Sequence, residues 1–491
     1  MDRREFIRKL TAGSIIAGTS PSFLLNGCAK ESGNPPNIIL IVSDDQGYAD
    51  MSCTGLNKDA RTPNLDRLAA NGVRFTQAYA TSPICNPSRA GLITGCYQER
   101  WGTWWYGGPG IHDPGYKTIP ELLKTVGYKT GYVGKVHYGI SDSDTANRSF
   151  PLNHGFDSFF GFTSARKHYL IHQQEKEDEF QQIKEKYDRM GQSLRQQPLW
   201  DNFEKVNVNA FTTEIFSEKA CAFIDKNKSK PFFLQVAFNA VHNFTHQLPP
   251  EYLHEEGLKG YHDWDPATEE YYEWYKAGRK PNNPEGRAHY LGQLHFLDRE
   301  IGKILDHLTK TGMDKNTVIF YISDNGGSTP IYADNTPLRG SKYLLYEGGI
   351  RVPMIISYPK KYIKGTVINN VVSAMDILPT ICGLTGLKSP EYVDGNDLNP
   401  LLKGANTGIR HDTLVWDTGH EIAVRSGKWK LHIVLNDDNA KYEMVEVELG
   451  EFLCDLEADP GETTNLKDQY PEVFESLKEV HAIWKEEMLE K

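Results

Sequence analysis

Cysteine is scarce in this sequence, and its spacing excludes two common uses of the residue. Seven cysteines are spread over 491 residues. No two of them form a Cys-x-x-Cys pair, so neither a dense disulfide framework nor a cysteine zinc site is expected. Basic clusters are also missing, because the formal net charge is −11 and no stripe of lysine and arginine offsets it. We therefore expect no binding to nucleic acid and no general attraction to anionic membranes.

Long apolar runs are absent after the N-terminal segment, since no later stretch approaches the about 18 residues that a membrane span needs. Residues 1–28 are interpreted as a lipoprotein signal peptide, in which Arg3 and Arg4 precede a modestly apolar stretch. The stretch ends in a sequence that resembles a bacterial lipobox, with Cys28 as the lipidated residue. A transmembrane anchor is the alternative, but the stretch is short and contains Pro21. We expect an exported protein, in the periplasm or at the cell surface, held to the membrane only by a lipid on Cys28.

Apolar runs typical of strands recur along the chain and alternate with helix patterns. Strands buried on both faces of a sheet are expected at 37–42, 130–135, 232–237 and 317–322. Helices are expected from Thr62-Pro63, with Thr62 as the N-cap, and at about 118–127 and 287–310. This alternation predicts an α/β fold with a large central sheet, mixed or mostly parallel, sandwiched by helices.

The expected domain limits follow from shifts in composition. Residues 29–36 are interpreted as a tether, 37–400 as the α/β domain, and 401–491 as a smaller C-terminal α+β domain with an antiparallel sheet. A final helix is expected from about Pro471 to Glu490. Within the larger domain, the charged segment from about 140 to 208 is interpreted as a solvated helix or insertion.

Polar residues follow the four expected strands. Because the carboxyl ends of parallel strands meet at one edge of a sheet, these side chains are expected to lie close together. Oxygen ligands after two of the strands suit Ca²⁺ or Mg²⁺ rather than zinc. Asp298, in contrast, is expected on a helix surface. The residues at the strand ends are Asp44 and Asp45, Lys135 and His137, His242, and Asp324 and Asn325.

The most specific motif begins at Cys85. Residues 85–95 match Cys-x-Pro-Ser-Arg-x-x-x-x-Thr-Gly at every fixed position, and an apolar helix is expected from Arg89. Taken alone, Cys85 would be a buried structural thiol or a thiolate nucleophile at a helix N-terminus. The complete motif resembles that of the type I, formylglycine-dependent sulfatases of the alkaline phosphatase superfamily. Bacterial carbohydrate sulfatases of this family are similar to the chain from end to end.

The resemblance implies a modified nucleophile and a bound metal. A maturation enzyme would oxidise Cys85 to formylglycine, whose hydrated aldehyde carries two hydroxyls on one carbon. One hydroxyl would attack sulfur, and loss of the proton from the other would then expel sulfate. The metal is expected to be Ca²⁺ rather than Mg²⁺. Its implied ligands are Asp44, Asp45, Asp324, Asn325 and the modified Cys85.

The resemblance also assigns roles to five cationic or basic side chains. Arg89 and Lys135 would stabilise the diol and the sulfate, and His137 would act as the base of the elimination step. His242 and Lys342 would contact the sulfate, with His242 also protonating the leaving oxygen. Together with Cys85, these residues form the expected catalytic set.

The expected substrate is a sulfated sugar from a host or environmental glycan. Substrate contacts are expected from Lys135, His242 and Lys342, and from five residues in variable segments: Trp105, Arg166, His168, Trp416 and His420. Two other functions remain open. One is a phosphodiesterase or phosphonate monoester hydrolase of the same superfamily, and the other is a catalytically inactive glycan-binding protein.

Overall fold

A computed structural model describes residues 34–490 apart from 140–143, 164, 166–167, 172–198, 266–267, 406–407, 409–410, 439 and 441–443. The predicted signal peptide, with Cys28, and the predicted substrate contact Arg166 lie outside the described residues. Within the described ranges, no helix has the length and apolar character needed to cross a membrane.

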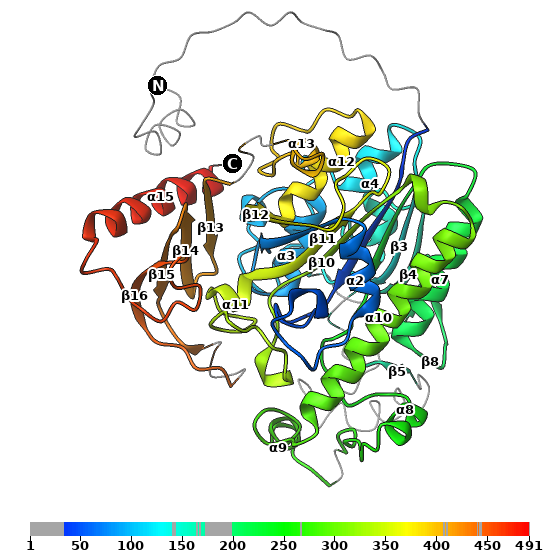
Figure 1. The fold of residues 1–491 in the computed structure, drawn as a ribbon, viewed down its shortest axis with the longest axis horizontal. Coiled ribbons are helices and arrows are strands. Elements are labelled where there is room, and N and C mark those ends of the chain that lie inside the picture. Colours follow the sequence, from blue (N-terminus) through cyan, green and yellow to red (C-terminus); the bar gives the residue numbers. More distant parts are fainter. Residues whose placement is uncertain are drawn as a thin grey trace, which may run out of the picture.

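A large mixed sheet forms the centre of the fold, as expected (Figure 1). Strands β10, β1, β9, β3 and β4 run parallel to one another, whereas β11 is antiparallel to both β10 and β2, and β6 is antiparallel to β4. The order across the sheet is β12 (Thr366–Ser373), β2 (Val73–Tyr79), β11 (Arg351–Ser357), β10 (Thr317–Ser323), β1 (Asn37–Ser43), β9 (Phe232–Ala237), β3 (Lys129–Lys135), β4 (Ser158–Phe162), β6 (Leu199–Asp201) and β7 (Glu204–Val206).

Both faces of this sheet are covered by helices, and β1 shows why. Its residues are buried along the strand, and they alternate between two apolar clusters on opposite faces. Ile38 and Leu40 pack with α3 (Cys85–Thr94), α4 (Ile119–Lys124) and α12 (Ile377–Thr385). Ile39 and Ile41 pack with α2 (Pro63–Ala70), α7 (Thr212–Asn227) and α10 (Gly286–Lys310). Each such buried side chain contributes about 1.5–3 kcal/mol, which explains the uninterrupted apolar run.

A separate antiparallel sheet lies in the C-terminal region, beside the main sheet (Figure 1). Helix α15 (Pro471–Leu489) packs on it through Phe474, Leu477 and Trp484. Its strands are β13 (Thr413–Asp417), β14 (Glu421–Ser426), β15 (Trp429–Val434) and β16 (Gly450–Asp455). Shorter elements are the pair β5 (Leu170–Ile171) and β8 (Ala210–Phe211), and helices α8 (Pro250–Glu255), α9 (Tyr271–Ala277), α11 (Glu347–Ile350) and α13 (Asn399–Leu402).

Two local expectations were wrong. The charged segment 140–208 is not simply a solvated insertion, because β4, β6 and β7 lie in it and extend the main sheet. Asp298 is not on a helix surface, since only 2% of it is exposed. Its carboxylate accepts hydrogen bonds from the backbone N–H groups of Asn64 (3.1 Å) and Leu65 (2.8 Å) and so caps the N-terminus of α2. Thr62 is the N-cap residue of α2, as expected, but its side chain makes no capping bond.

Candidate functional site

The four central parallel strands bring the predicted strand-end residues to one edge of the sheet. In the sheet, β10, β1, β9 and β3 are consecutive neighbours. Ser43 pairs with Ser323, so Asp44 and Asp324 follow at the same level of adjacent strands. His137 and His242 follow β3 and β9 in the same way, and all these side chains are buried.

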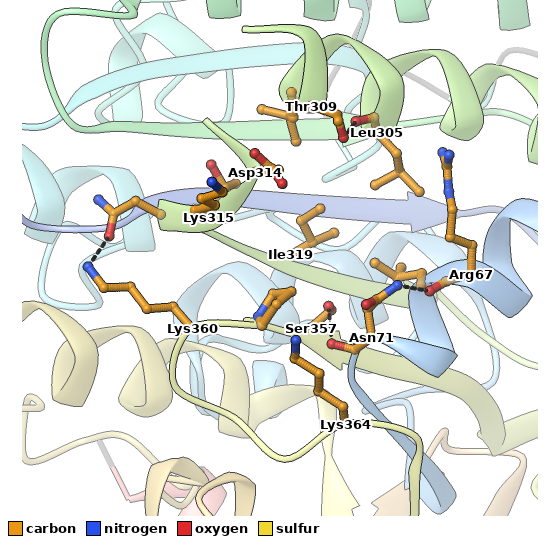
Figure 2. A pocket seen from close by; sticks show the side chains of 15 residues that line it. Arg67, Asn71, Leu305, Thr309, Asp314, Lys315, Ile319, Ser357, Lys360 and Lys364 are labelled. Atoms are coloured by element: carbon orange, nitrogen blue, oxygen red, sulfur yellow. Dashed lines mark hydrogen bonds between the residues drawn. The ribbon is translucent and has the colours of Figure 1, made fainter. Parts of the chain in front are cut away.

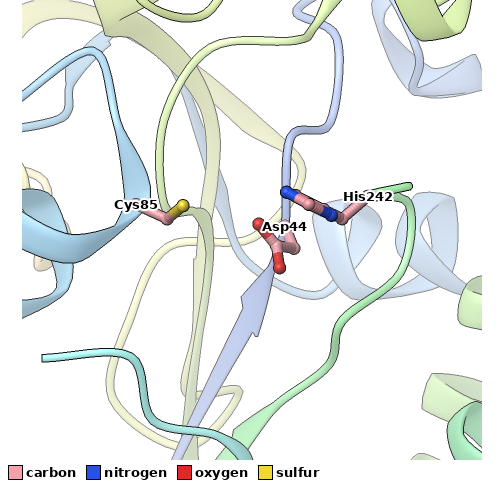
Figure 3. A group of neighbouring side chains, drawn as sticks. All are labelled: Asp44, Cys85 and His242. Carbon is pink, nitrogen blue, oxygen red and sulfur yellow. The ribbon is translucent and has the colours of Figure 1, made fainter. Parts of the chain in front are cut away.

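Cys85 faces this edge from the first residue of α3. The helix therefore begins four residues before the expected start at Arg89, and all ten of its residues are buried. Ligand atoms of Asp44, Cys85 and His242 lie within 4.8 Å of one another. Figure 3 shows their side chains approaching one another from the end of β1, the start of α3 and the loop after β9. Burial raises the pKa of the Cys85 thiol, although Lys135 and Lys342 act in the opposite direction. An unmodified Cys85 is therefore a thiol at neutral pH, which argues against a thiolate nucleophile.

Three carboxylates and one amide form an oxygen-rich cluster beside Cys85. Oxygens of Asp44, Asp45 and Asp324 lie within 4.8 Å of one another. The side-chain amide of Asn325 donates to Asp45 Oδ1 at 2.8 Å. Among the described residues, Asp44 Oδ1 and Asn325 Oδ1 are buried without a hydrogen-bond partner. Burial and the neighbouring Asp44 raise the pKa of Asp324 to about 6. Crowded, partly unsatisfied oxygens of this kind fit a divalent cation such as Ca²⁺.

Each carboxylate also lies close to at least one cationic side chain. Lys135 Nζ lies 2.5 Å from Asp44 Oδ2, and Arg89 Nε lies 2.7 Å from Asp324 Oδ2. The Arg89 guanidinium also donates to the backbone carbonyl of Lys135 at 2.8 Å. These contacts hold the guanidinium and ammonium groups in fixed positions.

Lys342 completes the pairing, because its Nζ lies 2.8 Å from a carboxylate oxygen of Asp45. Its placement depends on the chain after β10, where the backbone N–H of Lys342 donates to the carbonyl of Gly327 at 3.1 Å. Lys342 and Asp45 are both buried. Three ammonium or guanidinium groups therefore surround Cys85, and these are the donors that an anionic substrate needs.

The two predicted catalytic histidines are neutral in this environment. Burial, reinforced by Lys135 and Arg89, lowers the pKa of His137 well below its usual value. Burial and Lys342 do the same for the pKa of His242. His137 adopts a positive φ of 51°. Within the described part of the chain, its Nδ1 has no hydrogen-bond partner. A neutral imidazole can accept a proton, which is the property that a general base requires.

The predicted substrate contacts in the variable segments lie in different surroundings. Trp105 and His420 pack against each other, with ring centroids 5.4 Å apart. Trp416 is 2% exposed and its indole N–H donates to the carbonyl of Ala80 at 2.9 Å, so its contact with substrate stays a prediction. Its ring packs on Tyr79 between the two sheets. An apolar environment of that kind explains why a tryptophan in a variable segment can be structural.

His168, also a predicted contact, is buried in a polar cluster next to the loop that carries His242. Its Nδ1 lies 3.0 Å from Nε2 of Gln247, which in turn donates to Asp263 at 2.7 Å. His246 Nε2 lies 3.0 Å from the same carboxylate.

Sequence reasoning missed Tyr343, which immediately follows Lys342. Its ring is 6.2 Å from that of Tyr106, and the two hydroxyls are 3.5 Å apart. The Tyr106 hydroxyl lies 4.0 Å from Cys85 Sγ. An isolated tyrosine belongs to no motif. The one feature of the sequence that could have indicated Tyr343 as a site residue is its position next to Lys342.

A cavity of about 730 Å³ lies elsewhere, between α2, α10 and the amino end of β10 (Figure 2). Lys315, Lys360 and Lys364 stand around it, with Ile319 and Leu305 in its wall. The catalytic cluster lies at the opposite, carboxyl end of β10, and none of its residues lines this cavity. The cavity is therefore separate from the candidate site.

Comparison with known proteins agrees with the geometry of the cluster. The family model "Sulfatase" matches residues 36–387, and the model "N-sulphoglucosamine sulphohydrolase, C-terminal" matches residues 341–487. Arylsulfatase A of Bos taurus is 28% identical, over 92% of this chain and 88% of its own. N-acetylgalactosamine-6-sulfatase of Mus musculus is 29% identical, over 91% and 80%.

Solved structures share the fold of this chain. Ps i-CgsB in complex with k-i-k-neocarrahexaose is 30% identical, with a TM-score of 0.73 over 92% of this chain and 93% of that one. The phosphonate monoester hydrolase of Agrobacterium radiobacter is 20% identical with a TM-score of 0.62, covering 92% of this chain and 96% of its own, and shows the shared fold alone. The chain, which matches the family model over most of its length and carries the complete motif at Cys85, belongs to the type I sulfatase family and is a sulfuric ester hydrolase.

Proposed function

We propose that this sulfatase hydrolyses a sulfate ester on a sulfated sugar, with formylglycine made from Cys85 and with bound Ca²⁺. The observation that carries the proposal is the convergence of Cys85, the oxygen cluster and three cations at one edge of the sheet. A sugar substrate is supported by N-acetylgalactosamine-6-sulfatase among the relatives and by Ps i-CgsB, whose structure contains k-i-k-neocarrahexaose.

The two groups that complete the site supply different chemistry. Formylglycine supplies a hydroxyl nucleophile that can regenerate itself, and a maturation enzyme would form it from Cys85. Calcium supplies positive charge next to the sulfate oxygens. Asp44, Asp45, Asp324 and Asn325 would hold the ion, because their oxygens are clustered and two of them are unsatisfied in the described part of the chain.

The roles of the other residues follow from charge and position. Arg89, Lys135 and Lys342 bind and orient the anionic sulfate, since each is buried and fixed by a carboxylate. His242 protonates the oxygen of the departing sugar, which is otherwise a poor leaving group. Because burial and Lys342 lower its pKa, its imidazole must first take up a proton in the substrate complex. His137, whose pKa is lowered and whose Nδ1 is unpaired in the described structure, acts as the base of the elimination step.

Calcium dependence provides one test. Protein stripped with a chelator should lose p-nitrophenyl sulfate hydrolysis and thermal stability together, because three buried carboxylates would lose their cation. Adding Ca²⁺ should restore both properties, and Mg²⁺ should restore them less, since the cluster offers oxygens without the strict octahedral geometry that Mg²⁺ demands. Unchanged stability after complete removal of metal would contradict a calcium site.

Substrate class provides the second test. Rates on p-nitrophenyl sulfate and on bis(p-nitrophenyl) phosphate would be compared, with the Cys85→Ala variant as the control for background. We expect a preference for the sulfate ester. A large preference for the phosphodiester would instead support the phosphodiesterase or phosphonate monoester hydrolase alternative. A panel of sulfated mono- and disaccharides would then identify the sugar.

We also propose that the protein is exported and lipid-anchored at Cys28, in the periplasm or at the cell surface. The support is the sequence alone, in which the twin arginines and apolar stretch lead to Cys28. Labelling with a radioactive fatty acid in the native host should mark the wild-type chain and not Cys28→Ser. Equal labelling of both would contradict this anchor.

A further inference from the structure

Four aromatic side chains gather beside the nucleophile, and we call them the aromatic mouth: Trp105, Tyr106, Tyr343 and His420. Their rings form a continuous set of contacts. Trp105 lies 5.8 Å from Tyr106, 6.5 Å from Tyr343 and 5.4 Å from His420, between ring centroids. Tyr106 and Tyr343 are 6.2 Å apart. The mouth is therefore one surface rather than four separate side chains.

Three distant parts of the chain build this surface. Trp105 and Tyr106 follow the motif helix α3, Tyr343 follows the sulfate-binding Lys342, and His420 lies in the turn between β13 and β14 of the C-terminal sheet. His420 is held there by Asn436, whose Oδ1 lies 3.1 Å from its Nδ1. The smaller sheet thus contributes directly to the surroundings of the site.

The mouth is also close to the reacting atoms. The Tyr106 hydroxyl lies 4.0 Å from Cys85 Sγ, and its ring centroid is 6.1 Å from that of His137. Lys342 Nζ lies 5.4 Å from the centroid of the Tyr343 ring. A sulfate held by Lys342 beside Cys85 therefore leaves the rest of its ester next to these rings.

Aromatic side chains of the same segment differ in how they pack, and two neighbouring tryptophans pack into the interior. Trp101 is 7% exposed and contacts Tyr116, and Trp104 packs edge-on against Trp484 of α15. Tyr106, in the same segment, is 41% exposed. A large aromatic side chain left in solvent beside a nucleophile is typical of a binding surface.

Tyr343 gives a second indication, which comes from its backbone. It has a positive φ of 79°, a conformation that is costly for a residue with a bulky side chain. Its backbone N–H donates to the carbonyl of Pro83 at 2.9 Å, two residues before Cys85. The ring of Tyr343 is therefore held next to the segment that leads to Cys85 by a backbone conformation that is strained.

We propose that the aromatic mouth is the subsite for the sugar ring that carries the sulfate, with the apolar C–H face of the ring stacked on Tyr343 and Trp105. This inference rests on the proposed sulfated-sugar substrate. Hydroxyls of Tyr106 and Tyr343 at the edge of the surface favour a sugar, because they can hydrogen-bond to its hydroxyls while the rings cover its apolar face. Tyr343 and Trp105 are then specificity-determining residues, and His420 makes the C-terminal sheet part of the subsite.

The test compares Tyr343→Ala, Trp105→Ala and Tyr343→Phe in the full, formylglycine-containing enzyme. Its substrate is the sulfated saccharide on which the wild type is most active. Each alanine variant should raise KM by about two- to tenfold with a smaller change in kcat, because stacking on one aromatic ring has a binding effect of that order. Tyr343→Phe keeps the stacking ring and loses only the hydroxyl, so its KM should rise less than that of Tyr343→Ala. Alanine retains Cβ, so the backbone strain at this position is the same in both variants.

Inhibition by inorganic sulfate separates this subsite from the sulfate pocket. Inorganic sulfate is expected to bind at Lys342 without contacting the aromatic mouth. The inhibition constant of sulfate should therefore stay unchanged in the alanine variants. Tyr470→Ala is the matched control, since Tyr470 is 44% exposed and makes a similar tilted contact with Trp429. It should leave KM unchanged. An unchanged KM in both mouth variants, or an equal weakening of sulfate inhibition, would overturn the proposal. A wild type that hydrolyses p-nitrophenyl sulfate but no sulfated sugar would instead overturn the proposed sugar substrate.

Discussion

Buried charge pairs dominate the site at the scale of single residues. Asp44 pairs with Lys135, Asp45 with Lys342, and Asp324 with Arg89, all of them within 3 Å. Removing so many charges from water is costly, and apolar side chains of similar size would serve the fold as well or better. The pairs are therefore best explained by chemistry, in which fixed cations stabilise charge on a sulfate as it leaves.

Lys135 tests this interpretation. Lys135→Ala should lower kcat/KM for p-nitrophenyl sulfate by about 100- to 1,000-fold, the usual effect of removing one preorganised donor. Initial rates and thermal unfolding would be measured together. The control is Lys219→Ala, whose side chain makes an exposed ion pair with Asp201 at 3.5 Å and should change neither quantity appreciably. A folded Lys135→Ala protein with nearly wild-type kcat/KM would show that Lys135 does not stabilise the reaction.

At the scale of elements, the close approach of β3 to β9 positions the catalytic side chains. Gly134, one residue before Lys135, has a φ of 112°, and a Cβ there would lie 1.9 Å from the carbonyl oxygen of Ala237. The strand can therefore deliver Lys135 and His137 only because residue 134 lacks a side chain.

Gly134→Ala should destabilise the protein by about 3–5 kcal/mol, because it adds a steric clash to an unfavourable φ. Gly127→Ala separates the two effects. Its φ is 87°, and no atom lies within 4 Å of the position that a Cβ would take there. That control should cost only about 1–2 kcal/mol. Equal losses in denaturant unfolding of the two variants would show that the approach of β9 is not what restricts position 134.

Helix α15 is fixed to the small sheet by a carboxylate. Asp417 of β13 lies 2.9 Å from both His481 and Lys485. Burial alone would raise the pKa of Asp417, but these two partners lower it to about 2. Because this pKa is below the unfolded-state value of about 3.9, the ionised carboxylate of Asp417 stabilises the fold at neutral pH. That contribution is lost as the pH falls through about 2.

Asp417→Asn should therefore lower the free energy of unfolding by about 2–3 kcal/mol at pH 7. The difference from wild type should shrink as pH is lowered from about 4 to about 2, because the wild-type carboxylate becomes protonated there. Urea unfolding of both proteins across this range measures the difference. A gap that stays constant with pH would mean that the charge of Asp417 contributes nothing to the docking of α15.

Across the whole molecule, features encoded in contiguous residues were predictable from sequence. Strands β1 and β10 are uninterrupted apolar runs, and α10 was expected at 287–310 and observed at Gly286–Lys310. Features set by distant contacts were not predictable. Strand β4 lies in a charged segment, the cap of α2 comes from Asp298, and Trp416 is buried against the other sheet. The candidate catalytic residues were predicted through the family motif, whereas Tyr343 has no such signature.

The two sheets are joined by a buried ion network. Lys430 of β15 lies 3.2 Å from Glu347 and 2.8 Å from Glu462, and all three side chains are almost completely inaccessible to water. Glu347 begins α11, directly before β11 of the main sheet. This lysine therefore links the C-terminal sheet to the sheet that carries the site.

Lys430→Met should destabilise the protein by about 3–5 kcal/mol, because it leaves the buried Glu462 carboxylate without its cation and leaves Glu347 with Arg351, at 3.4 Å, as its cationic partner. Differential scanning calorimetry would measure the loss. The triple variant Lys430→Met with Glu347→Gln and Glu462→Gln should recover part of it, since the uncompensated charges are then removed. Failure to recover any stability would point to packing of the lysine stem rather than to charge.

The most direct measurement is the mass of the peptide that carries Cys85, taken from active protein purified from its native host. Formylglycine at position 85 is expected, so the peptide should have the mass of the aldehyde form and should react with a carbonyl-specific hydrazine. Active sulfatase whose Cys85 is entirely an unmodified thiol would contradict the proposed nucleophile.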